Sequence, residues 1–176
     1  MNIISIKYFL MGVFIYPCKI KEKVCGLASN EEMNALYEKY DALKEEILVL
    51  ENKSKYDDFI SPFEEGVYTY DGGQSHISIS YGTYGDFLHR LETLADNADT
   101  FHAFSTTISA SGIDNCVSYK VAEEMLEEFG KMETKAEKHF VKGEFDEYGK
   151  FLWNVYKRYM EVLQECIKIK GIVQYK

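Results

Sequence analysis

The chain has 176 residues, of which 46% are hydrophobic and 28% are charged, so its length and composition suit one globular domain with a buried core. Its formal net charge of −9 disfavours binding to nucleic-acid backbones, which requires a surplus of lysine and arginine on one face. The 14 tyrosines and 11 phenylalanines favour either a contact surface or the rim of a core, and both interpretations stay open.

The N-terminal stretch IISIKYFLMGVFIYPC is apolar, with a lysine ahead of its hydrophobic part. It has no small-residue cleavage site and is too interrupted to span a bilayer, so neither a signal peptide nor a membrane partner is expected. The β-branched and aromatic residues at 3–16 predict one or two buried strands. Pro17 is expected to end the strand, because proline cannot donate to a ladder, and residues 18–29 are expected to be a polar connection.

Residues 31–51 are predicted to form a helix. Asn30 is placed as its N-cap, and acidic residues follow where the helix dipole favours them. Apolar residues recur in steps of three and four, which predicts a seam packed within the chain; a dimeric coiled coil along this seam is the alternative. The seam consists of Met33, Leu36, Tyr40, Leu43, Ile47 and Leu50.

Residues 66–80 are predicted to form a β-hairpin. The sequence Asp71-Gly72-Gly73 is a turn signal, because glycine supplies the positive φ of tight hairpins. The alternation from His76 to Ser80 places Ile77 and Ile79 on one face of the second strand.

Helical spacing then predicts helices over 83–95, 118–142 and 144–169, the last with a buried stripe that starts at Tyr148, followed by a strand over 172–175. The predicted fold class is α+β. A small, mostly antiparallel sheet, made of the N-terminal strand, the hairpin and the C-terminal strand, packs against three to four helices in a single domain, residues 1–176.

The first candidate site is the junction where the predicted hairpin meets the next helix. The start of a helix offers unpaired N–H groups and a partial positive charge, and a glycine here would let a phosphate or carboxylate approach the backbone. The alternative is that Thr83 simply caps its own helix. No phosphate-binding glycine motif is present. The candidate ligand- or partner-binding residues are Ser80, Tyr81, Gly82, Thr83, Tyr84 and Arg90.

Catalytic candidates are few. Asp71 and Asp114 each lie at a predicted turn and are the weak candidates for a general base, although a turn acid usually bonds its own backbone. No nucleophilic serine or cysteine stands beside a base. No cofactor and no metal are expected, since the histidines lie on four different elements without ligand spacing. They are His76, His89, His102 and His139.

The four cysteines form no CxxC pair and no zinc-finger spacing, which predicts reduced thiols and a cytoplasmic location. A bridge between Cys18 and Cys25 is the alternative. The other two cysteines are Cys116 and Cys166.

The segment from Ser80 to Phe87, followed by Arg90-Leu91 and Leu94-Ala95, resembles the SYSGYxxWR…LA stretch of a family of small uncharacterised bacterial and phage proteins. Members commonly begin with MG-x-x-IY, which 11–16 match, and end with a long aromatic helix and a G-x-V-x-F strand similar to 171–175. The resemblance implies that Met11 is the usual start, with residues 1–10 an upstream extension, and that the Ser80–Tyr84 junction is the first site candidate. The family's acidic-glycine SDxEG turn keeps Asp114 in this chain but lacks the Glu-Gly, so no role for that second acid is carried over.

Three functions are compatible with these features. The first is a non-enzymatic binding protein, phage- or mobile-element-encoded, that inhibits a host defence protein or sequesters a small anionic ligand; the phage association comes from the resemblance alone. The second is a small hydrolase or transferase acting on a phosphorylated or glycosidic substrate, with Asp71 or Asp114 as base and Arg90 or Tyr81 stabilising charge. The third is a structural dimer built on the Met33–Leu50 seam. The chain is expected to be a monomer or a homodimer.

Overall fold

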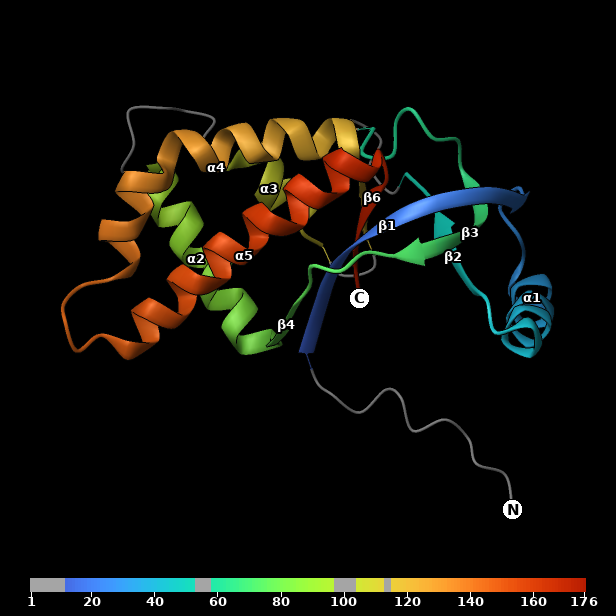
Figure 1. Cartoon of the computed structure of the whole chain (residues 1–176), viewed down its shortest axis with the longest axis horizontal. Helices are drawn as coiled ribbons and strands as arrows, with labels where there is room; N and C mark the ends of the chain where they lie inside the picture. The colour runs from blue at the N-terminus through green and yellow to red at the C-terminus, as the bar shows by residue number, and fades with distance from the viewer. Residues whose placement is uncertain (1–11, 53–57, 97–103, 113–114) are drawn as a thin grey trace, which may run out of the picture.

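The computed structural model describes residues 12–52, 58–96, 104–112 and 115–176 (Figure 1). Within these ranges the chain is α+β, with an antiparallel sheet packed against helices, as the sequence predicts. None of the described helices combines the length and the apolar character that crossing a bilayer requires. The elements are β1 (Gly12–Cys25), α1 (Asn30–Leu43), β2 (Glu46–Leu50), β3 (Gly66–Gly72), β4 (Ile77–Ser80), α2 (Tyr81–Asp96), α3 (Ser105–Ala110), β5 (Cys116–Ser118), α4 (Tyr119–Phe140), α5 (Glu147–Ile169) and β6 (Ile172–Tyr175).

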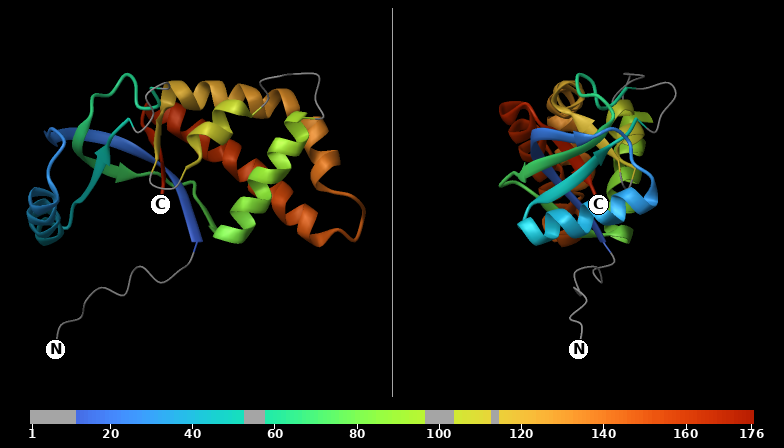
Figure 2. Two further views of the ribbon diagram at one scale, coloured as in Figure 1. Left: turned by 180° about the vertical axis from the view of Figure 1, so that it is seen from behind. Right: turned by 90° about the vertical axis from the view of Figure 1, so that its right-hand side faces the viewer.

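Strand β1 is the centre of the sheet. The strand order is β2-β3-β1-β6-β5, and β4 also pairs with β1. Helices α2, α4 and α5 gather at one end of the molecule, while α1 lies at the opposite end, beside β2 and β3 (Figure 1). In the right-hand view of Figure 2 the strands and α1 form the near end, with α4 and α5 behind them.

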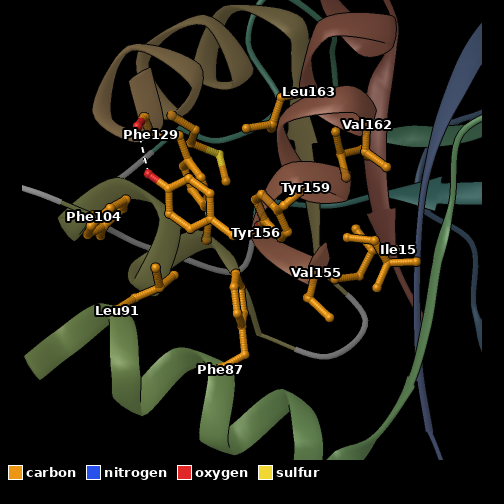
Figure 3. Close-up of a cluster of buried hydrophobic side chains, with 14 of the residues drawn as sticks. Ile15, Phe87, Leu91, Phe104, Phe129, Val155, Tyr156, Tyr159, Val162 and Leu163 are labelled. Atoms are coloured by element: carbon orange, nitrogen blue, oxygen red, sulfur yellow. Dashed lines mark hydrogen bonds between the residues drawn. The ribbon is translucent and has the colours of Figure 1, made fainter. Parts of the chain in front are cut away.

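The main core lies between the sheet and helices α2, α4 and α5, and aromatic rings pack against one another within it (Figure 3). The rings of Phe129 and Tyr159 stack with centroids 5.0 Å apart. The hydroxyl of Tyr156 donates to the carbonyl of Phe129 at 2.6 Å, and the hydroxyls of Tyr159 and Tyr175 bond to each other. Much of the tyrosine content therefore fills the core, with each buried hydroxyl given a partner.

A second core lies on the other face of a curled sheet. The thiol of Cys116 on β5 donates to the carbonyl of Val49 on β2 at 3.9 Å, so the two ends of the strand order approach each other. The side chains enclosed by this curl are Cys18, Leu48, Leu50, Ile60, Tyr68, Tyr70, Cys116 and Ile172.

The predicted helix over 31–51 is wrong beyond residue 43. Helix α1 ends at Leu43, where Lys44 takes a left-handed conformation with φ of 57°, and residues 46–50 pair with β3 as strand β2. Its N-cap is Ser29 rather than Asn30, in a reciprocal capping box with Glu32. The sequence EILVL satisfies a helical seam and a strand equally well, and pairing with β3 decides for the strand.

The predicted coiled-coil seam is accordingly not continuous. Met33, Leu36 and Tyr40 pack in a cluster with Ile47 and Val67 of the sheet. A dimer along a Met33–Leu50 helix is therefore excluded by the end of α1, whereas the oligomeric state itself stays a prediction.

The two strands of the predicted hairpin are present, but they do not pair with each other. Both lie antiparallel along the same side of β1, where Cys18 is opposite Gly72 and Ile15 is opposite Ile77. The segment between them is not a reversing turn. Instead, the N–H of Gly73 donates to the carbonyl of Pro17 at 2.7 Å, so β3 and β4 form one interrupted neighbour of β1.

The prediction that Pro17 ends the strand is wrong: β1 runs on to Cys25, through the residues expected to form a polar connection. The interruption between β3 and β4 explains this. Pro17 lies opposite the gap between β3 and β4, so its missing N–H costs no ladder bond. Residues 3–11, and with them the question of a start at Met11 and an extension over 1–10, lie outside the described residues. The helices predicted over 83–95, 118–142 and 144–169 correspond to α2, α4 and α5, and the strand over 172–175 to β6.

Candidate functional site

The predicted junction exists, and its cap is Ser80. Strand β4 ends at Ser80 and α2 begins at Tyr81. The Ser80 hydroxyl oxygen accepts the N–H of Thr83 at 3.1 Å and lies 2.9 Å from the Thr83 hydroxyl. Thr83 therefore does not cap its own helix, and one of the N–H groups proposed for an anion is already bonded within the chain.

The other junction residues divide between surface and core. Tyr81 is 46% exposed, and Gly82 is open to solvent. Tyr84 is buried, its hydroxyl donates to the carbonyl of Ser111 at 2.6 Å, and burial raises the pKa of its phenol. Tyr84 is therefore a core residue, whereas Tyr81 remains available for contact.

Arg90 is occupied elsewhere. Its Nη1 donates to the carbonyl of Phe140 at 2.8 Å, and its guanidinium lies over the Phe140 ring, 5.9 Å from the centroid. Because Phe140 is the last residue of α4, Arg90 satisfies a carbonyl at the end of that helix. The structure thus gives it a role in joining α2 to α4.

The two acidic candidates do not gain a site from the fold. Asp71 is exposed at the end of β3, with Oδ1 at 3.4 Å from Nζ of Lys21 on β1, as in a surface ion pair. Asp114 lies outside the described residues.

Within the described ranges, no group of three or more histidine, cysteine or acidic side chains is placed to hold a metal ion. His76 stacks on Phe14, and His89 faces Glu92. The four cysteines are free thiols, so the alternative Cys18–Cys25 bridge is not formed. Burial raises the pKa of the Cys18 and Cys166 thiols, which makes them unreactive core residues.

The structure brings a different group to the predicted junction. Three aromatic side chains spaced by three residues, Phe145, Tyr148 and Phe151, lie on the surface at the start of α5, with exposed fractions of 90%, 45% and 44%. The Tyr148 and Phe151 rings stack with centroids 6.3 Å apart. We call these three residues the α5 aromatic face.

The α5 aromatic face lies beside α2. The hydroxyl of Tyr148 donates to Oδ2 of Asp86 at 2.6 Å, and this bond raises the pKa of the Tyr148 phenol. In Figure 1 the first turns of α5 lie next to α2, away from most of the sheet. Sequence reasoning missed this surface because Tyr148 has the helical phase of the buried stripe, four residues before the buried Leu152.

The turn that carries Phe145 is tightly held. The carboxylate of Asp146 accepts the N–H of Lys142 at 2.9 Å and the N–H of Gly149 at 2.8 Å, and these bonds lower the pKa of Asp146. The ammonium of Lys150 donates to the carbonyl of Glu144. Gly149 is required here, because a Cβ would lie 2.2 Å from the carbonyl oxygen of Phe140. Phe145 is therefore displayed from a fixed turn.

The surroundings of the α5 aromatic face are acidic. Asp86, Glu144 and Glu147 are exposed around it, and the nearby Lys150 is paired with Glu147 at 2.8 Å. Asp146 adds a fourth acid, and Arg90 and Lys142 add two more cations that act on it, so four acids meet three bases and the excess around the face is one negative charge, of the same sign as the overall charge of −9.

No family model matches the chain, and no curated protein and no solved structure matches it either. The resemblance to small bacterial and phage proteins therefore stays a prediction that rests on its motifs.

Proposed function

We propose that this protein binds another protein, without catalysis, through the α5 aromatic face. The observation that carries the proposal is Phe145, a phenyl ring that is 90% exposed on a turn fixed by the Asp146 carboxylate. Clustered exposed aromatic side chains are typical of protein contact surfaces, because a partner removes their apolar area from water.

The rigidity of the turn supports a binding role. A side chain presented from a fixed backbone loses little conformational freedom when a partner closes over it, so more of its burial energy appears as affinity. Aromatic anchors of this kind commonly dominate the energy of an interface. Phe145 would be the anchor, and Tyr148 and Phe151 its flanking contact area.

The charge pattern defines the partner. Asp86, Glu144 and Glu147 surround the face, so we infer a partner with an apolar pocket for Phe145 and lysine or arginine at the rim of that pocket. A small anionic ligand is less well supported, because Ser80 already occupies an N–H at the start of α2 and Asp86 lies one turn along it. Inhibition of a host protein is one such role, and its only support is the association with phage-like proteins.

The catalytic alternative has less support in the geometry. Asp71 faces Lys21, Arg90 holds the end of α4, and Tyr81 lies at the surface, so these three side chains have separate surroundings. A reaction would require them to meet at one substrate.

The experiment compares wild type with Phe145→Ser and with the control Leu43→Ser, which removes an apolar side chain that is 58% exposed on α1. Each purified protein is used as bait in a lysate of the source organism, and the Kd of the purified partner is then measured by calorimetry. We expect Phe145→Ser to weaken binding at least about tenfold, the loss expected of an anchor residue, while Leu43→Ser leaves the Kd unchanged.

Equal binding by all three proteins, or no partner for the wild type, would overturn the proposal. Light scattering on the same samples tests the other possible occupant of this face, a second copy of the chain. If the wild type is a dimer and Phe145→Ser is a monomer, the face mediates self-association and the proposal of a different partner protein is overturned.

A further inference from the structure

An open cavity of about 320 Å³ lies between α3, the start of α4 and the segment before Ile60. Its volume falls at the lower end of the range typical of small-molecule sites. None of the lining residues belongs to the α5 aromatic face. The cavity is lined by Asp58, Phe59, Ser105, Thr106, Ser109, Val121 and Glu124.

Helix α3 is fixed against α4 by a side chain just below the cavity. The carboxylate of Glu128 accepts the N–H of Thr106 at 3.3 Å and the N–H of Thr107 at 3.4 Å. Phe104, at the N-cap position of α3, supplies no side-chain acceptor, so Glu128 takes the place of a cap. The hydroxyls of α3 are thereby held in a set position beside the cavity.

The two carboxylates of the lining come from different segments of the chain. Glu124 lies on α4 one turn before Glu128, three residues after Val121. In the other segment, Oδ1 of Asp58 accepts the N–H of Ser61 at 3.1 Å. The carbonyl of Phe59 accepts the N–H of Ser118 at 2.6 Å, which ties this segment to the start of α4.

The chemistry of the lining excludes several ligands. Two carboxylates repel an anion, and burying them against an apolar ligand would cost their hydration. Two carboxylates are too few for a metal, and the described residues hold no metal-binding group of three.

We propose that this cavity binds one ring of a neutral sugar. The hydroxyls of Ser105, Thr106 and Ser109 both donate and accept, and Asp58 and Glu124 accept, which together match the hydroxyl rim of a sugar. Phe59 and Val121 supply apolar surface for its C–H face. The Ser105 hydroxyl already donates to Oε1 of Glu128 at 3.4 Å. An organic cation would satisfy the carboxylates, but it offers donors only and gives the Ser109 hydroxyl no acceptor.

The test uses saturation-transfer NMR on the full chain with four probes: the methyl glycosides of glucose, galactose and N-acetylglucosamine, and tetramethylammonium as the organic cation. Titration up to about 20 mM is appropriate, because one ring held by a few hydrogen bonds binds with a millimolar Kd. The variants are Glu124→Gln and Ser109→Ala. The matched control is Glu123→Gln, an exposed neighbour on α4 that does not line the cavity.

We expect at least one glycoside to bind, with an affinity reduced about fivefold or more in both cavity variants and unchanged in Glu123→Gln. Phe145→Ser should bind the glycoside normally, which separates this site from the proposed protein contact. Absence of transfer for all three glycosides, equal binding by the cavity variants, or binding of tetramethylammonium in place of sugar would each overturn the proposal.

Discussion

The hydroxyl of Tyr148 donates a 2.6 Å hydrogen bond to Oδ2 of Asp86 and so joins the first turn of α5 to α2. This bond connects the predicted strand–helix junction to the aromatic surface that the sequence did not reveal. It also keeps the Tyr148 ring in one position, stacked against Phe151.

We expect Tyr148→Phe and Asp86→Asn to show a coupling of about 0.5 kcal/mol in a double-mutant cycle, because the bond is exposed and water competes for both groups. Urea unfolding of the wild type, the two single variants and the double variant measures this coupling. Strictly additive effects would contradict a bond between the two side chains.

Glu165 on α5 holds the segment between β3 and β4. Its carboxylate oxygens accept the N–H of Gln74 at 2.8 Å and the N–H of Ser75 at 2.7 Å. Glu165→Gln should cost about 1–2 kcal/mol of unfolding free energy near neutral pH, since an amide offers only one oxygen to two donors. Glu137→Gln, at an exposed position on α4, is the control and should be neutral.

The pH dependence of that loss has a definite sign. Partial burial raises the pKa of Glu165. The hydrogen bonds from the N–H groups of Gln74 and Ser75 together lower this pKa by more, so the net shift is downward. A lowered native pKa stabilises the fold above the unfolded value and loses this contribution as pH falls through the native value. The difference between wild type and Glu165→Gln should therefore shrink towards about pH 3, and a constant difference would contradict this.

The sequence could predict the long helices of this fold but not the pairing of its strands. The long helices α2, α4 and α5 were predictable because their apolar residues follow one periodicity and each is buried along that stripe. The pairing of β3 and β4 with β1, and not with each other, was not predictable, because Asp71-Gly72-Gly73 has the composition of a tight turn whether or not the chain reverses. The contact that decides it, between Glu165 and the segment that follows Gly73, joins residues some ninety positions apart.

The candidate site divides in the same way. The strand-to-helix change at Ser80 and Tyr81 is readable locally, and it is where the sequence places it. The exposure of Tyr148 could not be predicted locally, because its helical phase matches that of the buried Leu152 and its hydroxyl partner, Asp86, lies on another helix, α2. The periodicity of one segment does not show which side chains of distant elements will contact it.

Glu128 should show a pH dependence of opposite sign to that of Glu165. Burial raises its pKa more than the bonds from Thr106 and Thr107 lower it. Its contribution to stability is therefore complete below the unfolded pKa and is lost as pH rises through the native value. The unfolding free energy of wild type, compared with that of Glu128→Gln, should therefore decrease as pH rises from about pH 4 to pH 7 in urea unfolding. An increase over that range would show that the ionised carboxylate is the better cap for α3.

Two glycines make a matched pair for testing the packing of α5 against β1. A Cβ on Gly171, which joins α5 to β6, would lie 2.0 Å from the carbonyl oxygen of Cys18 in the central strand, so the backbone would have to shift. Gly171→Ala should therefore lower the unfolding free energy by about 3 kcal/mol.

Gly130, on the exposed side of α4, has nothing within 4 Å of an added Cβ. Gly130→Ala should instead stabilise by about 0.5–1 kcal/mol, because alanine is the better helix former. Thermal and urea unfolding measure both, and a Gly171→Ala protein as stable as wild type would mean that β6 does not sit against β1 in the register described.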